Sequence, residues 1–274
     1  MEPIKSFSKN IDDIKLYIEI FASEKMSETF LEEFENNAFK NKADNVFILL
    51  HGNGEDGRLF SKNIDAFCDG CYVITVDSRG HGNSTHGEQK LTIDLMAEDL
   101  SKLCDELNIG KFKLLGFSDG GNIALTYAVR HPERLSGLVV VGANIDPAGI
   151  KFFYRSDMII KYLFANMFYK NNKVKKIRFE LLDLMVNYPH IAPRLLKNIV
   201  CPTLVVDAQY DVIKCSHTDL IAKYIPNSTQ VRIKKAHHNV FADAPDRVNK
   251  LVHDFITKGD KIEWYFQPAG NSFK

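Results

Sequence analysis

The chain has 274 residues, of which 45% are hydrophobic and 26% charged, and this is the composition of a globular protein large enough to bury its own core. Its 35 basic residues balance 35 acidic residues, which argues against a nucleic-acid-binding domain, and its five irregularly spaced cysteines do not resemble a disulfide framework. Residues 1–13 lack the apolar segment of a signal peptide and no run of about eighteen apolar residues occurs, so we expect a cytoplasmic protein with no nucleic-acid or membrane partner.

The first 45 residues contain two segments in which apolar and acidic residues mix, Tyr17–Phe21 and Phe30–Phe34. They predict one or two leading strands, antiparallel to the rest at an edge of a sheet. From Val46 onward, short apolar runs alternate with amphipathic stretches, which is typical of a parallel sheet covered by helices. The fold class predicted is therefore α/β, with a mostly parallel sheet flanked by helices.

The predicted strands are near-continuous apolar runs, as expected for strands buried on both faces. They are Val46–Leu50, Tyr72–Val76, Phe112–Gly116, Leu138–Gly142, Thr203–Asp207 and Gln230–Lys234. The predicted helices are Leu59–Phe67, Ile93–Leu107, Gly120–Arg130, His217–Tyr224 and Asp246–Thr257.

Residues 144–200 interrupt this rhythm with a segment rich in aromatic residues and methionine. A crossover between two strands needs only one helix. A segment of this length therefore predicts an inserted helical cap. We therefore expect residues 1–143 and 201–274 to form the core and residues 144–200 to form the cap. The basic run from Lys170 to Arg178 is interpreted as a solvated face.

Cys68 and Cys71 form a C-x-x-C pair, which can signal a metal site or a redox site. A zinc site would require a second such pair, and none occurs in the sequence. The pair lies between a predicted helix and a predicted strand, so we interpret both cysteines as packed or free thiols. No metal and no cofactor are expected.

Ser118 lies in Gly116–Gly120, a G-x-S-x-G motif between a predicted strand and a predicted helix. In that context the motif predicts a nucleophile elbow, a tight turn that presents the serine oxygen above the carboxyl edge of the sheet. The backbone N–H of Asp119 begins the helix and can stabilise an oxyanion. A second N–H must come from the loop after the first strong strand, where His51–Gly54 supplies the amide of Asn53.

A serine nucleophile needs a histidine base and a carboxylate that orients it, in the chain order serine, acid, histidine. The histidines after Ser118 are His131, His190, His217, His237, His238 and His253. Only the adjacent pair His237 and His238 falls in the loop after the last predicted strand. His81 precedes the serine and so fits the triad order poorly. His51 also precedes the serine and is interpreted as structural, as are Asp77 and Arg79 in the loop that contains His81.

Asp211 is the favoured acid, because it follows a predicted strand at the edge where a site residue belongs. Asp207, nearer the strand, and Asp146, after another strand, are the alternatives.

Together these motifs resemble those of the α/β-hydrolase fold family, in family order over about residues 45–258. The family commonly carries Gly-His-Asn before a helix, with proline a few residues later. Asn239 and Pro245 align that pattern with His238, and His237 replaces the glycine. The resemblance therefore implies His238 as the base and places Asp211 in the usual acid loop.

Within the family, Gly116–Gly121, Pro132 and Gly142–Asn144 are most similar to the valacyclovirase-like α-amino-ester hydrolases. In that group an acidic side chain near the serine recognises an ammonium group, which implies this role for Asp119.

The expected activity is hydrolysis of a small or medium carboxylic ester through an acyl-enzyme on Ser118. Asp119, Phe117, Phe153, Met158 and Phe164 are the candidate substrate-binding residues, because ligand clefts are lined mostly by apolar groups. Carbon–carbon bond hydrolysis, lactonase and perhydrolase chemistry could use the same residues. A non-catalytic small-molecule-binding protein of this fold is the remaining alternative. We expect a small-molecule substrate as partner and a monomer or homodimer.

Overall fold

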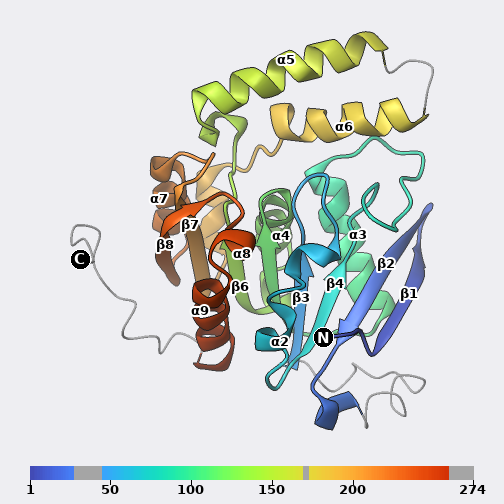
Figure 1. Ribbon diagram of the computed structural model, residues 1–274, viewed down its shortest axis with the longest axis vertical. Coiled ribbons are helices and arrows are strands. Elements are labelled where there is room, and N and C mark those ends of the chain that lie inside the picture. Colours follow the sequence, from blue (N-terminus) through green and yellow to red (C-terminus); the bar gives the residue numbers. More distant parts are fainter. Residues whose placement is uncertain (28–44, 169–172, 259–274) are drawn as a thin grey trace.

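The computed structural model describes residues 1–27, 45–168 and 173–258, and within these ranges eight strands form one sheet in the order β1-β2-β4-β3-β5-β6-β7-β8 (Figure 1). β1 pairs antiparallel with β2 and β2 antiparallel with β4, whereas every other pairing is parallel. The strand bounds are β1 (Lys5–Ile11), β2 (Ile14–Phe21), β3 (Val46–Leu50), β4 (Tyr72–Val76), β5 (Phe112–Phe117), β6 (Leu135–Val141), β7 (Thr203–Tyr210) and β8 (Ser228–His237). The predicted fold class is therefore confirmed.

Helices cover both faces of this sheet, and two further helices, α5 and α6, lie beyond its end (Figure 1). The helices are α2 (Ile64–Phe67), α3 (Ile93–Glu106), α4 (Asp119–Arg130), α5 (Phe152–Phe168), α6 (Lys173–Asn187), α7 (Cys215–Tyr224), α8 (Val240–Asp243) and α9 (Pro245–Lys258). Short 3-10 turns are η2 (Gly57–Phe60), η3 (Pro132–Arg134), η4 (Pro147–Gly149) and η6 (Pro193–Asn198). β3 is buried throughout, and its alternate side chains enter two different hydrophobic clusters. Ile48 packs in the cluster that includes α3, α4 and α7, and Phe47 packs in the cluster that includes α2 and α9. None of the described helices combines the length and apolarity needed to cross a membrane.

The six strands predicted after residue 45 are all present, and β3 and β4 have the predicted bounds. The antiparallel leading strand is confirmed as β2, which contains Tyr17–Phe21. β1 was not predicted, because Phe7 and Ile11 are its only strongly apolar residues and it lies at the sheet edge. The segment Phe30–Phe34 lies outside the described residues.

The prediction of one helix over Leu59–Phe67 is wrong. The chain there forms η2 and then the short helix α2. The turns between them close with short-range bonds, from Ser61 N to the Arg58 oxygen and from Asn63 N to the Phe60 oxygen. Asn63 is also buried and its side-chain amide donates to Asn249 Oδ1 (2.6 Å) in α9. Contact with a distant helix therefore replaces continuous helical bonding.

Helices α5 and α6 occupy the predicted cap and lie together beyond the end of the sheet, at the top of Figure 1. They pack against each other, with the ring of Tyr162 stacked on that of Phe179 at 5.0 Å. Two buried carboxylates of α6 hold the helix to the loop before α3, since Glu180 accepts from the Leu91 N–H (2.9 Å) and Asp183 pairs with Lys90 (2.7 Å). The division into a core and a cap domain stays a prediction.

Candidate active site

Ser118 lies between β5 and α4 in a strained backbone conformation, with φ 52° and ψ −119°. Such a conformation costs a residue with a side chain about 1–3 kcal/mol. The turn closes only because the residues two positions before and two positions after Ser118 are glycines. A Cβ on Gly116 would lie 2.1 Å from the Gly120 oxygen, and a Cβ on Gly120 would lie 2.3 Å from the Leu50 oxygen. The predicted elbow is therefore a tight strand-to-helix turn that holds the serine at the end of the strand.

His238 lies between Ser118 and Asp211. Its Nε2 is 2.9 Å from Ser118 Oγ, and its Nδ1 is 2.7 Å from Asp211 Oδ1. β7 ends directly before Asp211, and His238 directly follows β8, so two adjacent parallel strands deliver the two side chains to the elbow. This geometry allows His238 to take a proton from the serine while Asp211 holds the opposite ring nitrogen.

Asp211 is almost fully buried, at 1% exposure. Burial alone would raise its pKa, but the hydrogen bond and positive charge of His238, together with backbone N–H groups, hold the pKa of Asp211 below its ordinary value. The N–H of Ile213 donates to Oδ1 (3.0 Å) and the N–H of Ala208 donates to Oδ2 (3.3 Å). The carboxylate is thus kept charged and fixed in orientation.

The alternative acids and the alternative base lie elsewhere. His237 is exposed and pairs with Asp243 (3.0 Å). Asp207 forms a salt bridge with Arg232 (2.8 Å). Asp146 accepts from the N–H of Ala148 at the start of η4 and contacts His190 (3.1 Å). Of the candidates, the structure brings His238 and Asp211 to Ser118.

The two predicted oxyanion donors are linked through their side chains. Asp119 is the first residue of α4, so its backbone N–H has no acceptor within the helix. Asn53, in the loop after β3, donates from Nδ2 to Asp119 Oδ2 (2.8 Å) and to the main-chain oxygen of Leu181 in α6 (2.9 Å). One amide therefore ties together the loop, the elbow and helix α6.

Both carboxylate oxygens of Asp119 are bonded inside the protein. Oδ2 accepts from Asn53, and Oδ1 accepts from Asn122 Nδ2 (3.0 Å). The side chain is buried, and burial raises the pKa of Asp119 despite these two amide donors. Asp119 therefore supports the loop that carries Asn53.

Glu55 is a site residue that the sequence interpretation missed. Its Oε2 accepts from the N–H of Gly52 (3.1 Å). A Cβ on Gly52 would lie 2.6 Å from Glu55 Oε2 and 3.2 Å from Ser118 Cβ, so the carboxylate and the serine flank the same glycine. Burial raises the pKa of Glu55, whereas the charge of His238 lowers it. The signal available in the sequence was an acidic residue three positions after Gly52 in the oxyanion loop.

The predicted substrate-binding side chains occupy different environments. Phe117 is buried, and its ring lies 4.9 Å from that of His238. Met158 is half-buried in α5. Phe153 and Phe164 are 84% and 63% exposed, and by helical spacing they lie on the face of α5 opposite Tyr162, which contacts α6. Both rings are therefore largely exposed, and their role in substrate binding stays a prediction.

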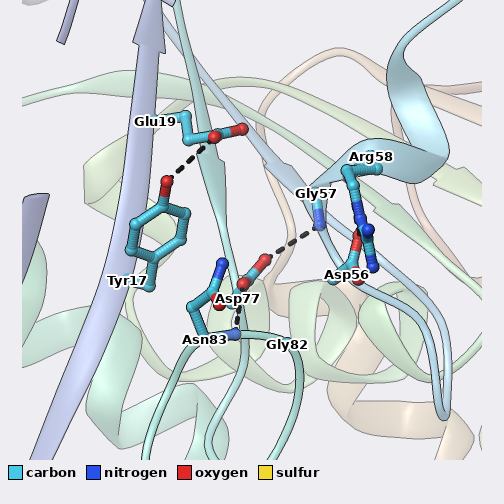
Figure 2. A pocket seen from close by; sticks show the side chains of 8 residues that line it. All are labelled: Tyr17, Glu19, Asp56, Gly57, Arg58, Asp77, Gly82 and Asn83. Atoms are coloured by element: carbon cyan, nitrogen blue, oxygen red, sulfur yellow. Dashed lines mark hydrogen bonds and ion pairs between the residues drawn. The ribbon is translucent and has the colours of Figure 1, made fainter. Parts of the chain in front are cut away.

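A separate hollow of about 190 Å³ lies beside β2, as Figure 2 shows. Three of its lining residues are acidic: Glu19, Asp56 and Asp77. Each is already bonded inside the protein. Glu19 accepts from the Tyr17 hydroxyl, Asp56 pairs with Arg58, and Asp77 accepts from the N–H groups of Gly57 (2.9 Å) and Asn83 (2.8 Å) (Figure 2). Asp77 joins the loops after β3 and β4, in agreement with its predicted structural role.

The other structural interpretations also agree with the packing. Arg79 is completely buried and donates from two nitrogens to Asp99 (both 2.8 Å). Cys68 and Cys71 are buried free thiols, and burial raises the pKa of Cys68 to about 12. Within the described ranges no cluster of three or more His, Cys, Asp or Glu side chains could hold a metal ion.

This chain is similar to known proteins in sequence and in fold. A family model described as the alpha/beta hydrolase fold matches residues 45–180. A Haemophilus influenzae protein named "Putative esterase/lipase" is 28% identical over 244 residues, covering 78% of this chain and 83% of that protein. Human serine hydrolase BPHL is 27% identical over 205 residues, covering 67% of this chain and 69% of BPHL. Among solved structures, a thermophilic esterase from Thermogutta terrifontis matches with a TM-score of 0.70 at 23% identity, covering 93% of this chain and 98% of the esterase.

Proposed function

This chain belongs to the α/β-hydrolase family and is a hydrolase, and from that premise we propose that it cleaves a small or medium carboxylic ester through an acyl-enzyme on Ser118. One observation carries the proposal. His238 contacts Ser118 Oγ at 2.9 Å with one ring nitrogen and Asp211 Oδ1 at 2.7 Å with the other. That arrangement is what serine activation requires, because the base must be both in reach and held in the correct tautomer.

In the acylation step, Ser118 Oγ attacks the ester carbonyl carbon and its proton passes to His238 Nε2. Asp211 stabilises the imidazolium that forms. The negative charge moves to the carbonyl oxygen, where the N–H groups of Asn53 and Asp119 would hold it. The tetrahedral intermediate then breaks its bond to the alcohol oxygen, which takes the proton from Nε2, and the acyl group remains on Ser118.

In the deacylation step, His238 removes a proton from a water molecule that attacks the acyl carbonyl. The bond to Ser118 Oγ breaks, the serine recovers its proton from His238, and the carboxylic acid is released. Each oxyanion donor contributes about 3–4 kcal/mol in enzymes where single donors have been removed. The linkage of Asn53 to Asp119 supports this step, because it holds the two donor segments together.

A fluorophosphonate probe and a substrate panel test the proposal. We expect the probe to label the folded wild-type protein on Ser118 and to leave Ser118→Ala unlabelled. The panel contains activated esters, lactones and substrates for carbon–carbon bond hydrolysis, together with an assay of peracid formation. We expect simple esters to be turned over fastest. If the probe labels Ser118 but another substrate class is turned over fastest, the reaction is reassigned to that class. A folded protein that is not labelled would favour the non-catalytic binding alternative.

A further inference from the structure

Two carboxylates lie beside the proposed nucleophile in addition to the proposed acid, and they differ in what their oxygens bond. Asp119 follows Ser118 in the chain, and each of its oxygens accepts an amide N–H from an asparagine. Glu55 flanks Gly52 together with Ser118, and only its Oε2 is bonded, to the Gly52 N–H. Among the described residues no donor bonds the second oxygen of Glu55, and its side chain is only partly buried. Glu55 is therefore the carboxylate that can still accept a bond from a ligand.

The position of Glu55 has a chemical consequence for the proposed reaction. It is two residues from Asn53, whose N–H is a proposed oxyanion donor, and its backbone N–H closes the same turn by donating to the Gly52 oxygen (3.3 Å). A carboxylate this close to a developing oxyanion opposes the negative charge. A positive group on the substrate would remove that repulsion and at the same time pair with the free oxygen. The same carboxylate would repel a substrate that carries a negative group.

We propose that Glu55 determines substrate charge, by binding a cationic group, such as an ammonium, close to the scissile carbonyl. This inference rests on the proposed esterase function and deepens it. The resemblance to amino-ester hydrolases implies that role for Asp119, but the internal bonds of Asp119 give it a supporting role instead.

The test uses three esters of one leaving group, whose acyl chains have the same length and end in an ammonium, a methyl or a carboxylate group. In the wild type we expect kcat/KM to be highest for the ammonium ester. In Glu55→Gln we expect the ratio of kcat/KM for the ammonium ester to that for the methyl ester to fall about 10- to 100-fold, the range of one partly buried ion pair. The carboxylate ester should gain relative to the methyl ester.

Glutamine is a suitable replacement because its oxygen can still accept the Gly52 N–H. Glu88→Gln is the matched control, since it removes one exposed carboxylate from the loop before α3 and should leave the ratio as in the wild type. Asp119→Asn separates the two carboxylates: it disturbs the bonds that hold Asn53, so it should lower kcat/KM for all three esters in parallel.

An unchanged ratio in Glu55→Gln would overturn the proposal, and so would a ratio that falls in Asp119→Asn alone. Should Glu55→Gln fail to fold, the wild type still provides a test, because added salt should slow the ammonium ester and speed the carboxylate ester. Equal salt dependence of the three esters would contradict charge selection by Glu55. Failure of the esterase function itself is distinguishable, since the wild type would then hydrolyse none of the three esters and leave Ser118 unlabelled.

Discussion

Asp211→Asn is the substitution that tests the site most directly, because asparagine has the shape of aspartate but carries an NH2 group in place of one carboxylate oxygen. The oxygen Oδ1 accepts from both His238 Nδ1 (2.7 Å) and the Ile213 N–H (3.0 Å), and Oδ2 accepts from the Ala208 N–H (3.3 Å). In one orientation of asparagine, its NH2 meets the Ala208 N–H. In the other, its NH2 meets the Ile213 N–H and also donates to His238 Nδ1.

The second orientation removes the proton from Nδ1 and places it on Nε2, facing Ser118 Oγ, so that His238 cannot act as a base. Every orientation also leaves one buried N–H without an acceptor, which costs about 1–3 kcal/mol. We therefore expect kcat to fall by about 10³- to 10⁴-fold, or about 4–5 kcal/mol in activation free energy. The free energy of unfolding should fall by about 1–3 kcal/mol.

The assay is kcat on an activated ester, with urea unfolding of the same preparations. Asp146→Asn is the control, because Asp146 bonds Ala148 and His190 and has no contact with His238 in the described residues. It should retain wild-type kcat to within a few-fold. If Asp211→Asn keeps more than about a tenth of wild-type kcat, Asp211 does not hold His238 in the tautomer that a serine–histidine–aspartate triad requires.

Gly116→Ala should prevent folding or lower the free energy of unfolding by several kcal/mol, because its Cβ would meet the Gly120 oxygen. Gly110→Ala is the control and should be tolerated, because no atom lies within 4 Å of the added Cβ. Ser118→Gly should be about 1 kcal/mol more stable to urea than Ser118→Ala, because glycine relieves the positive-φ strain that alanine keeps. His81 should make the protein acid-sensitive: burial lowers its pKa to about 4 from 6.5, so the unfolded state takes up the proton first and stability falls as pH falls below about 6.5. By pH 4 the loss should reach about 3 kcal/mol, and His81→Phe should flatten this part of the urea-unfolding profile.

Each of these predictions has a result that contradicts it. A soluble Gly116→Ala protein with wild-type stability would mean that the elbow backbone has room to move. Equal urea midpoints for Ser118→Gly and Ser118→Ala would show that the turn stores little strain. An acid limb that is unchanged in His81→Phe would assign the pH dependence to other buried groups, such as His51, whose pKa is also lowered by burial.

Much of the fold could be predicted because its signals are local. Strands β3 and β4 are unbroken apolar runs, so their bounds follow from the residues themselves. The elbow is also local, because the glycines that its turn requires, Gly116 and Gly120, are each two residues from Ser118 in the chain. His238 and Asp211 were candidates because parallel strands deliver their carboxyl-terminal loops to one edge of a sheet.

Tertiary structure decided what depends on contacts between distant residues. Loop position favoured Asp211 over Asp207 and Asp146 as the acid, and packing then brought Asp211 to His238 while Asp207 met Arg232. The bonds of Asn53 to Asp119, 66 residues away, and to Leu181, 128 residues away, are set by how the loop, α4 and α6 pack. The same packing places Glu55 beside Ser118, because β3, which precedes the loop of Glu55, and β5, which ends directly before Ser118, are neighbours in the sheet. The residues by themselves determined which chemistry the chain could carry, and the arrangement of its strands determined which side chains meet to perform it.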